Sequence, residues 1–169
     1  MAKPQVDVIV EARMTSSRLP GKVMLPAAGK PLLEHMVERL RRIDPLSNVI
    51  IATTENPSDD CIIELADRLK IRSFRGDEID VLGRVLKAAQ HFGTDVIVEI
   101  TGDDPLLDPK AASEVVQTYL DKEKEVDYVA NDLEEGFPVG FNTRAFSTKL
   151  LEFVERSTNH PVNREHVVN

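Results

Sequence analysis

Residues 6–22 read VDVIVEARMTSSRLPGK, and this stretch indicates the class of fold. Its first five residues form an apolar, mostly β-branched run that only Asp7 interrupts, which is typical of a strand buried in a parallel sheet. A long loop with prolines and glycines follows as far as Lys30, and apolar residues then recur at helical spacing from Leu32 to Ile43. A buried strand, a loop and an amphipathic helix in this order predict the first unit of an α/β domain.

The rest of the chain repeats this alternation of strand and helix. Further strands are predicted over residues 49–52, 71–74, 95–101 and 126–130. Helices are predicted from Ser58 to about Lys70, from Val81 to near Gly93, from Pro109 onward and from Ser147 onward. Residues 133–146 are predicted to be irregular, because they are punctuated by Gly136, Pro138 and Gly140. Strands that alternate with helices imply right-handed βαβ crossovers, so we expect one layered α/β domain over residues 1–169.

The composition fits a globular protein with a full apolar core, because apolar residues make up 41% of the 169 residues and charged residues 30%. The single cysteine, Cys61, cannot form a disulfide within the chain. No apolar run approaches the roughly 18 residues of a membrane span, so we expect a cytoplasmic protein without membrane contact. The net charge of −8 argues against a general binder of nucleic acid.

Positive charge is concentrated at the start of the chain. Residues 1–42 carry eight basic and four acidic residues, whereas residues 43–169 carry 13 basic and 25 acidic ones. The loop after the first strand holds three cations and three hydroxyls close together, namely Arg13, Thr15, Ser16, Ser17, Arg18 and Lys22. This mixture suits a triphosphate, because all of these groups donate hydrogen bonds to phosphate oxygens. The spacing matches neither a Walker loop nor a dinucleotide fingerprint, and the composition alone is equally typical of a solvated basic loop.

The pattern of these residues resembles a known family. The opening signature of the cytidylyltransferases that activate sugars is similar to the run Arg13-x-x-Ser16-x-Arg18-Leu19-Pro20-x-Lys22, followed by Gly29-Lys30-Pro31-Leu32-Leu33. The family includes CMP-Kdo synthetases, acylneuraminate cytidylyltransferases and, as the closest match, the relatives of spore-coat polysaccharide biosynthesis. Further similar motifs occur in the family's order along nearly the whole chain: Ala52-Thr53, Asp80-Val81-Leu82-x-Arg84, Thr101-Gly102-Asp103-x-Pro105-Leu106-x-Asp108-Pro109 and Asn163-Arg164-Glu165-His166-Val167.

The resemblance implies a nucleotide-diphosphosugar-transferase-like fold, which is a Rossmann-related three-layer α/β sandwich with a mainly parallel sheet. It also implies an enzyme that transfers CMP from CTP to a sugar hydroxyl and releases pyrophosphate, in the synthesis of a surface polysaccharide precursor. It places Arg13, Ser16 and Lys22 on the phosphates, with Arg18 on a phosphate or on the loop's own conformation. The further residues implied for nucleotide binding are Ala12, Thr53, Gly102 and Arg84, of which Arg84 also suits a solvated position on its helix.

Two carboxylates follow the strand predicted over residues 95–101. Asp103 and Asp104 precede Pro105, and paired acids in such a turn often serve only as turn formers or helix caps. The resemblance implies instead that Asp103 is a ligand of Mg²⁺, a hard cation that takes one or two protein oxygens and completes its shell with water and phosphate. It implies that Asp104 supports this ligand. The residues expected to act in catalysis are therefore Arg13, Lys22 and Asp103.

The candidates for contact with the acceptor sugar are residues 136–142 and residues 164–166, and Arg144 or Arg164 would suit an acidic sugar. The chain departs from the family pattern in two places. Relatives continue the Pro-x-Gly segment as Leu-Asp-Val-Glu-Val-Phe, whereas residues 141–146 read FNTRAF and lack both acids. Relatives also continue past the Arg-Glu-His-Val motif into a strand and a helix that carry a further metal-binding acid. This chain stops at residue 169, so we expect its single domain to lack that strand and helix.

Two other functions fit the same residues. The chain would be a CTP-binding subunit without catalytic activity if the missing acid is essential for turnover. It would be a glycosyltransferase of related fold if its acidic turn acted as an Asp-x-Asp metal motif toward a nucleotide-sugar, but Asp103-Asp104-Pro105 lacks that spacing. The resemblance also makes a homodimer an expected assembly.

Overall fold

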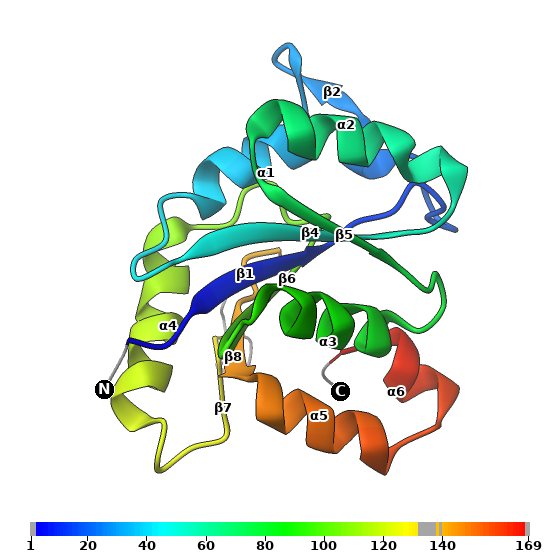
Figure 1. Cartoon of the computed structure of the whole chain (residues 1–169). Coiled ribbons are helices and arrows are strands. Elements are labelled where there is room, and N and C mark those ends of the chain that lie inside the picture. Colours follow the sequence, from blue (N-terminus) through cyan, green and yellow to red (C-terminus); the bar gives the residue numbers. More distant parts are fainter. Residues whose placement is uncertain (1–2, 132–137, 139, 168–169) are drawn as a thin grey trace.

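A computed structural model describes residues 3–131, 138 and 140–167 of the chain. Within these residues the centre is a six-stranded sheet with the strand order β5-β4-β1-β6-β8-β7. Its strands are β1 (Val6–Glu11), β4 (Asn48–Thr54), β5 (Arg72–Gly76), β6 (Val96–Thr101), β7 (Tyr128–Ala130) and β8 (Arg144–Ser147). A small hairpin, β2 (Pro26–Ala27) and β3 (Lys30–Pro31), projects at the top of Figure 1 from the loop that follows β1.

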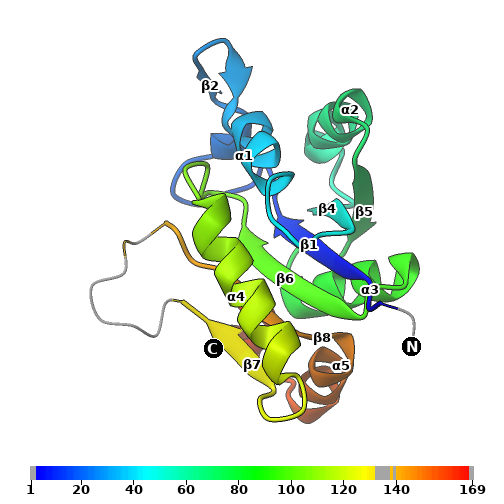
Figure 2. The same ribbon diagram turned by 90° about the vertical axis from the view of Figure 1, so that its left-hand side faces the viewer.

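Helices cover both faces of the sheet. They are α1 (Leu32–Leu40), α2 (Asp60–Leu69), α3 (Val81–Phe92), α4 (Pro109–Lys122), α5 (Thr148–Ser157) and α6 (Pro161–Glu165), with 3-10 turns η1 (Lys22–Met24) and η2 (Pro57–Asp59). In Figure 1, α1 and α2 lie above the sheet and α3, α5 and α6 lie below it, and Figure 2 shows α4 packed along the sheet beside α1. The predicted three-layer α/β sandwich is confirmed. No helix within the described residues is long and apolar enough to cross a bilayer.

The sheet is mainly parallel, as predicted. Strands β5, β4, β1 and β6 run parallel to one another, and β8 pairs antiparallel with both β6 and β7. The prediction that residues 133–146 are irregular is wrong at their end, because β8 starts at Arg144. The pairing of this short strand depends on distant residues: Ala145 and Phe146 are buried, and Arg144 forms an ion pair with Glu99 of β6.

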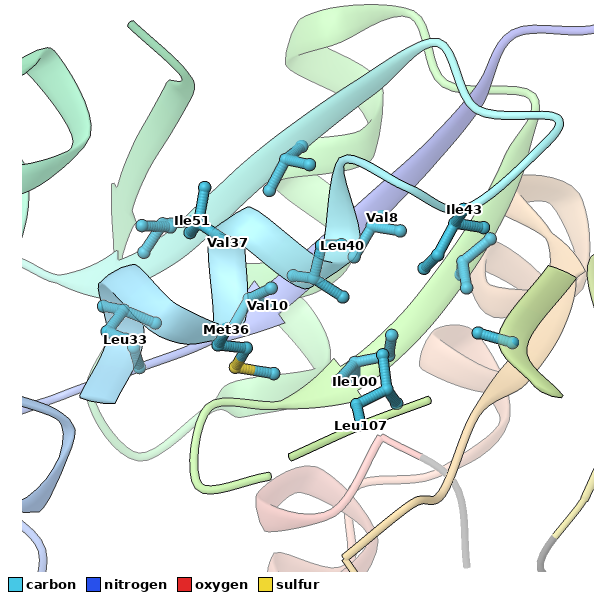
Figure 3. Close-up of a cluster of buried hydrophobic side chains, with 14 of the residues drawn as sticks. Val8, Val10, Leu33, Met36, Val37, Leu40, Ile43, Ile51, Ile100 and Leu107 are labelled. Atoms are coloured by element: carbon cyan, nitrogen blue, oxygen red, sulfur yellow. The ribbon is translucent and has the colours of Figure 1, made fainter. Parts of the chain in front are cut away.

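The core is split by the sheet into two clusters. One cluster joins α1, α2 and α4 to one face of the strands, and Figure 3 shows Leu33, Met36, Val37 and Leu40 of α1 directed toward Val8, Val10, Ile51 and Ile100. The other cluster joins α3 and α5 to the opposite face. Full burial of one such side chain contributes about 1.5–3 kcal/mol, so the two clusters hold the strands and their connecting loops in place.

The helix ends agree with most of the predicted signals. The side chains of Asp80, Asp108 and Ser147 cap the N-termini of α3, α4 and α5, and Gly93 ends α3 in the left-handed conformation with φ 71°. The predicted cap at Ser58 is wrong, because the Asn56 side chain caps η2 and α2 begins only at Asp60. The structure also adds α6, whose five residues are too few for a recognisable apolar period.

The parallel strands bring the sequence motifs to one edge of the sheet. Strands β1, β4 and β6 are paired in register, so their carboxyl ends at Glu11, Thr54 and Thr101 lie at the same edge. The backbone N–H of Gly102 donates to the carbonyl of Glu11 at 2.9 Å, which joins the two loops that leave β1 and β6. Ligands of open α/β sheets bind at this edge, so the candidate site lies where the basic and acidic loops meet.

Candidate functional site

A cleft of about 220 Å³ lies at the carboxyl edge of the sheet. Its walls come from the loops after β1 and β6, the first turns of α3 and the C-terminal end of α6. Eight of the residues singled out in the sequence line it together: Ala12, Arg13, Ser16, Arg18, Lys22, Arg84, Gly102 and Asp103. The structure therefore brings together residues that are up to 91 positions apart in the chain.

The basic loop is folded tightly on itself. Gly21 adopts φ 72°, a left-handed conformation that glycine tolerates, and its N–H donates to the carbonyl of Met14 at 2.8 Å. The N–H of Lys22 then donates to the carbonyl of Leu19 at 3.2 Å and begins η1. The hydroxyl of Ser16 accepts from the N–H of Leu19 at 3.5 Å, which leaves its own proton available for a ligand.

The two arginines of the cleft converge on one loop. Arg13 Nη1 donates to the backbone carbonyl of Glu78 at 2.9 Å, and Arg84 Nη1 donates to the carbonyls of Asp77 and, at 3.3 Å, of Glu78. Arg84 is only 2% exposed, so it is not the solvated helix charge that the sequence left open. Burial lowers the pKa of Arg84, and its Nε atom has no hydrogen-bond partner among the described residues.

An ion pair joins the basic and the acidic loop. Lys22 Nζ donates to Asp103 Oδ2, and the two side chains are 25% and 42% exposed. Burial opposes ionisation of Asp103, but the hydrogen bond and the charge of Lys22 outweigh it and lower the pKa of this carboxyl. The expected phosphate-binding cation and the expected metal ligand are therefore in contact with each other.

Asp104 differs from its neighbour in its environment. Its Oδ2 accepts from the hydroxyl of Thr101 at 2.9 Å, and burial raises its pKa. Only Asp103 of the two acids lines the cleft. Within the described part of the chain no three His, Cys, Asp or Glu side chains gather in a way that could hold a metal ion, so a cation at Asp103 would need further oxygens from water or from a ligand.

Gly102 is required by the close approach of two strands. A Cβ atom built on it would lie 2.4 Å from the backbone oxygen of Glu11, a distance that any larger residue would have to relieve by moving the backbone. The sequence predicted that Gly102 contacts the nucleotide, and the structure does place it in the lining of the cleft. Its glycine character, however, is explained by packing against β1.

Among the residues predicted to bind the nucleotide, Thr53 does not line the cleft. It is fully buried in β4, and its hydroxyl donates to Asp59 Oδ2 at 2.9 Å. The same carboxylate accepts from the hydroxyl of Thr54, and its Oδ1 accepts from the N–H of Met14 at 2.8 Å. In this structure Thr53 helps Asp59 to hold the start of the basic loop, and its contact with a nucleotide stays a prediction.

Sequence reasoning missed two neighbouring carboxyls at the cleft. Glu11 lines the cleft and lies near the buried Glu99, whose carboxylate accepts from Arg144 Nη1 at 3.0 Å. Burial first, and then the charge and hydrogen bond of Glu99, hold the pKa of Glu11 well above its usual range. The one available signal was a carboxylate at the end of an otherwise apolar strand, directly before the basic loop.

The structure places the residues proposed to contact the acceptor sugar in different environments. Glu165 and His166 line the cleft, so the end of α6 closes it on one side. Arg164 instead forms ion pairs with Asp80 and, at 3.1 Å, with Glu155, so protein carboxylates occupy its guanidinium.

The same holds for Arg144, which pairs with Glu99 inside the sheet. Only part of the segment over residues 136–142 belongs to the described residues. Gly140 lies beside the acidic turn, because a Cβ atom built on it would be 3.5 Å from Asp104 Oδ1. Gly136, Phe137 and Val139 lie outside the described residues.

Comparisons with known proteins agree with this geometry. The sequence model of the family described as "Cytidylyltransferase" matches residues 8–168. An uncharacterised protein of Methanocaldococcus jannaschii is 35% identical over 159 residues, which cover 94% of this chain and 63% of that protein. The spore coat polysaccharide biosynthesis protein SpsF of Bacillus subtilis is 32% identical over 152 residues, which cover 88% of this chain and 61% of SpsF. The chain therefore spans a little over 60% of the length of these curated relatives.

Solved structures show the same likeness. A cytidylyltransferase from Leptospira borgpetersenii superposes with a TM-score of 0.93 at 34% identity, covering 98% of this chain and 69% of that one. A CMP:2-keto-3-deoxy-manno-octonic acid synthetase, solved in complex with CTP, superposes with a TM-score of 0.74 at 18% identity, covering 95% of this chain and 82% of that one. At that lower identity the likeness shows the fold alone.

Proposed function

Since this chain belongs to the cytidylyltransferase family, we propose that it binds CTP in the cleft and transfers its CMP group to a hydroxyl of a sugar. The observation that carries the proposal is the meeting of Lys22 and Asp103 across the cleft. A cation for the phosphates and a carboxylate for a divalent metal are the two groups that transfer of a nucleotidyl group requires. The relative SpsF, named for spore coat polysaccharide biosynthesis, supports a role in making a polysaccharide precursor.

The reaction forms one phosphorus–oxygen bond and breaks another. The sugar hydroxyl attacks the α-phosphorus of CTP, the bond from that phosphorus to the bridging oxygen of the β-phosphate breaks, and pyrophosphate leaves with the electron pair. Arg13 and Lys22 would meet the negative charge of the triphosphate, and the Ser16 hydroxyl would donate to one of its oxygens. In-line displacement depends chiefly on positioning, which the tight fold of the basic loop supports.

The carboxylate of Asp103 makes the cleft suitable for a Mg²⁺ ion. Asp103 presents a partly exposed, ionised carboxylate to the cleft, and Mg²⁺ commonly takes one or two carboxylates and completes its octahedron with water and substrate phosphates. We propose that Asp103 holds this ion and that Asp104, bonded to Thr101, stiffens the turn that carries it. When bound, Mg²⁺ supplies positive charge next to the phosphates.

The acceptor sugar would enter beside α6. Glu165 and His166 line the cleft from α6 and the residue after it, and they provide hydrogen-bonding groups for sugar hydroxyls. Several 3-deoxy-manno-octulosonate cytidylyltransferases match this chain over about two thirds of its length, one of them at 31% identity. They support a sugar acid as the first acceptor to try.

A pyrophosphate-release assay tests the proposal. The chain is incubated with CTP, Mg²⁺ and a panel of sugars that includes 3-deoxy-manno-octulosonate, and the same panel is run with the gene's full reading frame if that frame is longer. We expect release that depends on both CTP and one sugar. Calorimetric CTP binding without release in either form would select a CTP-binding, non-catalytic subunit, and absence of both binding and release would refute the proposal.

A further inference from the structure

The short helix α6 forms one wall of the cleft without burying a side chain of its own. None of its five residues, all of which the structure describes, is buried. A helix of this length is unstable by itself in water, because its few hydrogen bonds do not compensate for the ordering of its backbone. Glu165 of α6 and His166 after it nevertheless line the cleft. Contacts with other elements must therefore hold α6 in place.

Arg164 makes the first of these contacts. Its Nη2 donates to Asp80 Oδ2, and its Nη1 donates to Glu155 Oε1 at 3.1 Å and to the backbone carbonyl of Glu155 at 3.3 Å. The Arg164 side chain is 17% exposed, so both ion pairs are partly shielded from solvent. Arginine suits this position, because its planar guanidinium donates in two directions at once, whereas lysine is a single point of charge. Arg164 thus links α6 to the start of α3 and to α5, beside which α6 lies in Figure 1.

The first turn of α3 has room for this arginine. The carboxylate of Asp80 caps α3 through Oδ1, which accepts from the N–H of Gly83 at 3.0 Å, and pairs with Arg164 through Oδ2. A Cβ atom on Gly83 would lie 2.2 Å from Asp80 Oδ2 and 3.0 Å from Arg164 Nη2. Glycine is a poor helix former, and the space that the ion pair occupies explains its presence here. The motif that starts at Asp80 and the motif that contains Arg164, 84 residues apart, are therefore joined in the structure.

Val167 makes the second contact. It is 5% exposed and belongs to the apolar cluster that joins α3 and α5 to the sheet. Glu165 and His166 therefore lie between two anchored residues, the ion-paired Arg164 and the buried Val167. These two anchors fix the stretch of chain that closes the cleft on this side.

We propose that Arg164 is a positioning residue for the acceptor sugar: bound between Asp80 and Glu155, it holds the end of α6 against α3 and so places Glu165 and His166 in the wall of the cleft. The inference rests on the proposed function, because it requires that the sugar binds beside α6. It differs from a direct contact between Arg164 and a sugar carboxylate, because both Nη atoms of Arg164 already donate to protein carboxylates.

Hydrogen exchange tests whether Arg164 holds α6. The N–H groups at positions 164 and 166 donate to the carbonyls of His160 and Val162, both at 3.1 Å, so their exchange reports opening of α6. Arg164→Met has similar length and makes no ion pair, and Arg156→Met, an exposed change on α5, is the matched control. We expect exchange at these two amides to be at least about fivefold faster in Arg164→Met and unchanged in the control, and exchange within α3 to be unchanged in both.

Kinetics test what the anchored helix does for the reaction. The substrate is the sugar that gives the fastest pyrophosphate release in the panel that includes 3-deoxy-manno-octulosonate. Arg164→Met should raise the KM for this sugar by about tenfold, because the wall that contacts it is misplaced, and should leave the affinity for CTP within about twofold. Arg164→Lys keeps the charge but reaches only one carboxylate, so its KM should lie between the two. A merely destabilised protein would instead lose affinity for CTP and exchange faster throughout.

Two results in Arg164→Met would overturn the proposal: an unchanged KM for the sugar, or unchanged exchange at the two amides. If this variant fails to fold, Glu155→Met, which removes one of the two ion pairs, decides the question. It should raise the KM for the sugar by about threefold, and an unchanged KM would again overturn the proposal. Absence of release by the unaltered protein with every sugar would instead refute the proposed function. Hydrogen exchange needs no turnover, so it decides whether Arg164 holds α6 even then.

Discussion

Lys22 and Asp103 form an ion pair across the mouth of the cleft, although 81 residues separate them in the chain. In the proposed reaction each side chain would exchange this contact for a ligand, because a triphosphate would attract Lys22 and a divalent cation would attract Asp103. Both side chains are partly exposed, and an ion pair of this kind contributes only about 0–1 kcal/mol to stability. The pair can therefore open for a ligand at little cost to the fold.

Replacing Lys22 tests its role in turnover. Lys22→Ala removes one fixed cation from the developing charge at the α-phosphorus, so we expect pyrophosphate release to fall by about 100-fold. The free energy of unfolding should change by less than about 1 kcal/mol, since the side chain is partly solvated. The control is Lys30→Ala, in the same loop, whose ammonium pairs with the exposed Glu38. Equal turnover in Lys22→Ala and Lys30→Ala would remove Lys22 from the mechanism.

Replacing Asp103 distinguishes two of its roles: the ion pair with Lys22 and the binding of a metal ion. In the presence of a chelator, Asp103→Asn should bind CTP about fivefold more tightly, because Lys22 is released and a negative charge is lost. With Mg²⁺ added, the same variant should lose the stimulation that Mg²⁺ gives to the unaltered protein. Titration calorimetry with and without Mg²⁺ measures both effects, and Asp67→Asn on the exposed face of α2 is the control. An unchanged response to Mg²⁺ would contradict the assignment of Asp103 as the ligand.

The sequence predicted those parts of the molecule that depend on local signals. The apolar run at Val6, the cap at Ser147 and the left-handed end at Gly93 each have a signature within a few residues, and the structure confirms all three elements. The meeting of Lys22 and Asp103 was also predictable, because parallel strands end at the same edge and the family pattern singled out both residues. Local chemistry and topology together place most of the candidate site.

The parts that the sequence could not predict depend on distant neighbours. Nothing near Glu11 in the chain shows that its carboxyl will lie against Glu99 of β6 and near Arg84 of α3. Thr53 ends a strand beside the other motifs, but its hydroxyl turns to the buried Asp59. In both cases the partner of a polar side chain is set by packing, which one strand's sequence does not contain.

Asp59 offers a test through pH. Burial opposes its ionisation, but hydrogen bonds from Thr54, Met14 and Thr53 outweigh it and lower its pKa. Its contribution to stability is therefore present above the pKa of an unfolded aspartate, about 3.9, and is lost as the pH falls through the lower folded value. Asp59→Asn should cost about 2 kcal/mol of unfolding free energy at pH 7, and this difference should shrink toward pH 2.

Denaturant unfolding of both proteins at several pH values measures this difference. Thr53→Ala is the companion variant: it should lower stability by about 1 kcal/mol and leave the affinity for CTP unchanged, because Thr53 lies outside the cleft. A weaker affinity for CTP with unchanged stability would instead support the predicted contact of Thr53 with the nucleotide.

Gly102 tests the close approach of the two loops. In Gly102→Ala the new Cβ atom would meet the backbone oxygen of Glu11 at 2.4 Å, so β1 and the acidic turn must separate. We expect a loss of about 1–3 kcal/mol in unfolding free energy and a weaker affinity for CTP. Gly93→Asn is the control, since Gly93 has φ 71°, which asparagine tolerates, and no atom within 4 Å of a Cβ built there. Similar stability of the two variants would show that the backbone gives way easily.

The raised pKa of Glu11 predicts a pH dependence of stability that is opposite in sign to the one expected for Asp59. A carboxyl that binds its proton more tightly in the folded state stabilises that state fully below the unfolded pKa, about 4.3 for glutamate, and loses this contribution as the pH rises through the folded pKa. Glu11→Gln cannot ionise and mimics the protonated form. The unfolding free energy of this variant, relative to the unaltered protein, should therefore rise steadily above about pH 4.3 and level off only above the folded pKa of Glu11.

Parallel denaturant titrations between pH 4 and pH 9 measure this difference, in which the effects of other titrating groups largely cancel. A difference that stays constant over the whole range would mean that Glu11 titrates normally in the folded protein. The stability profile thus tests how burial and the neighbouring Glu99 affect Glu11 in the folded protein.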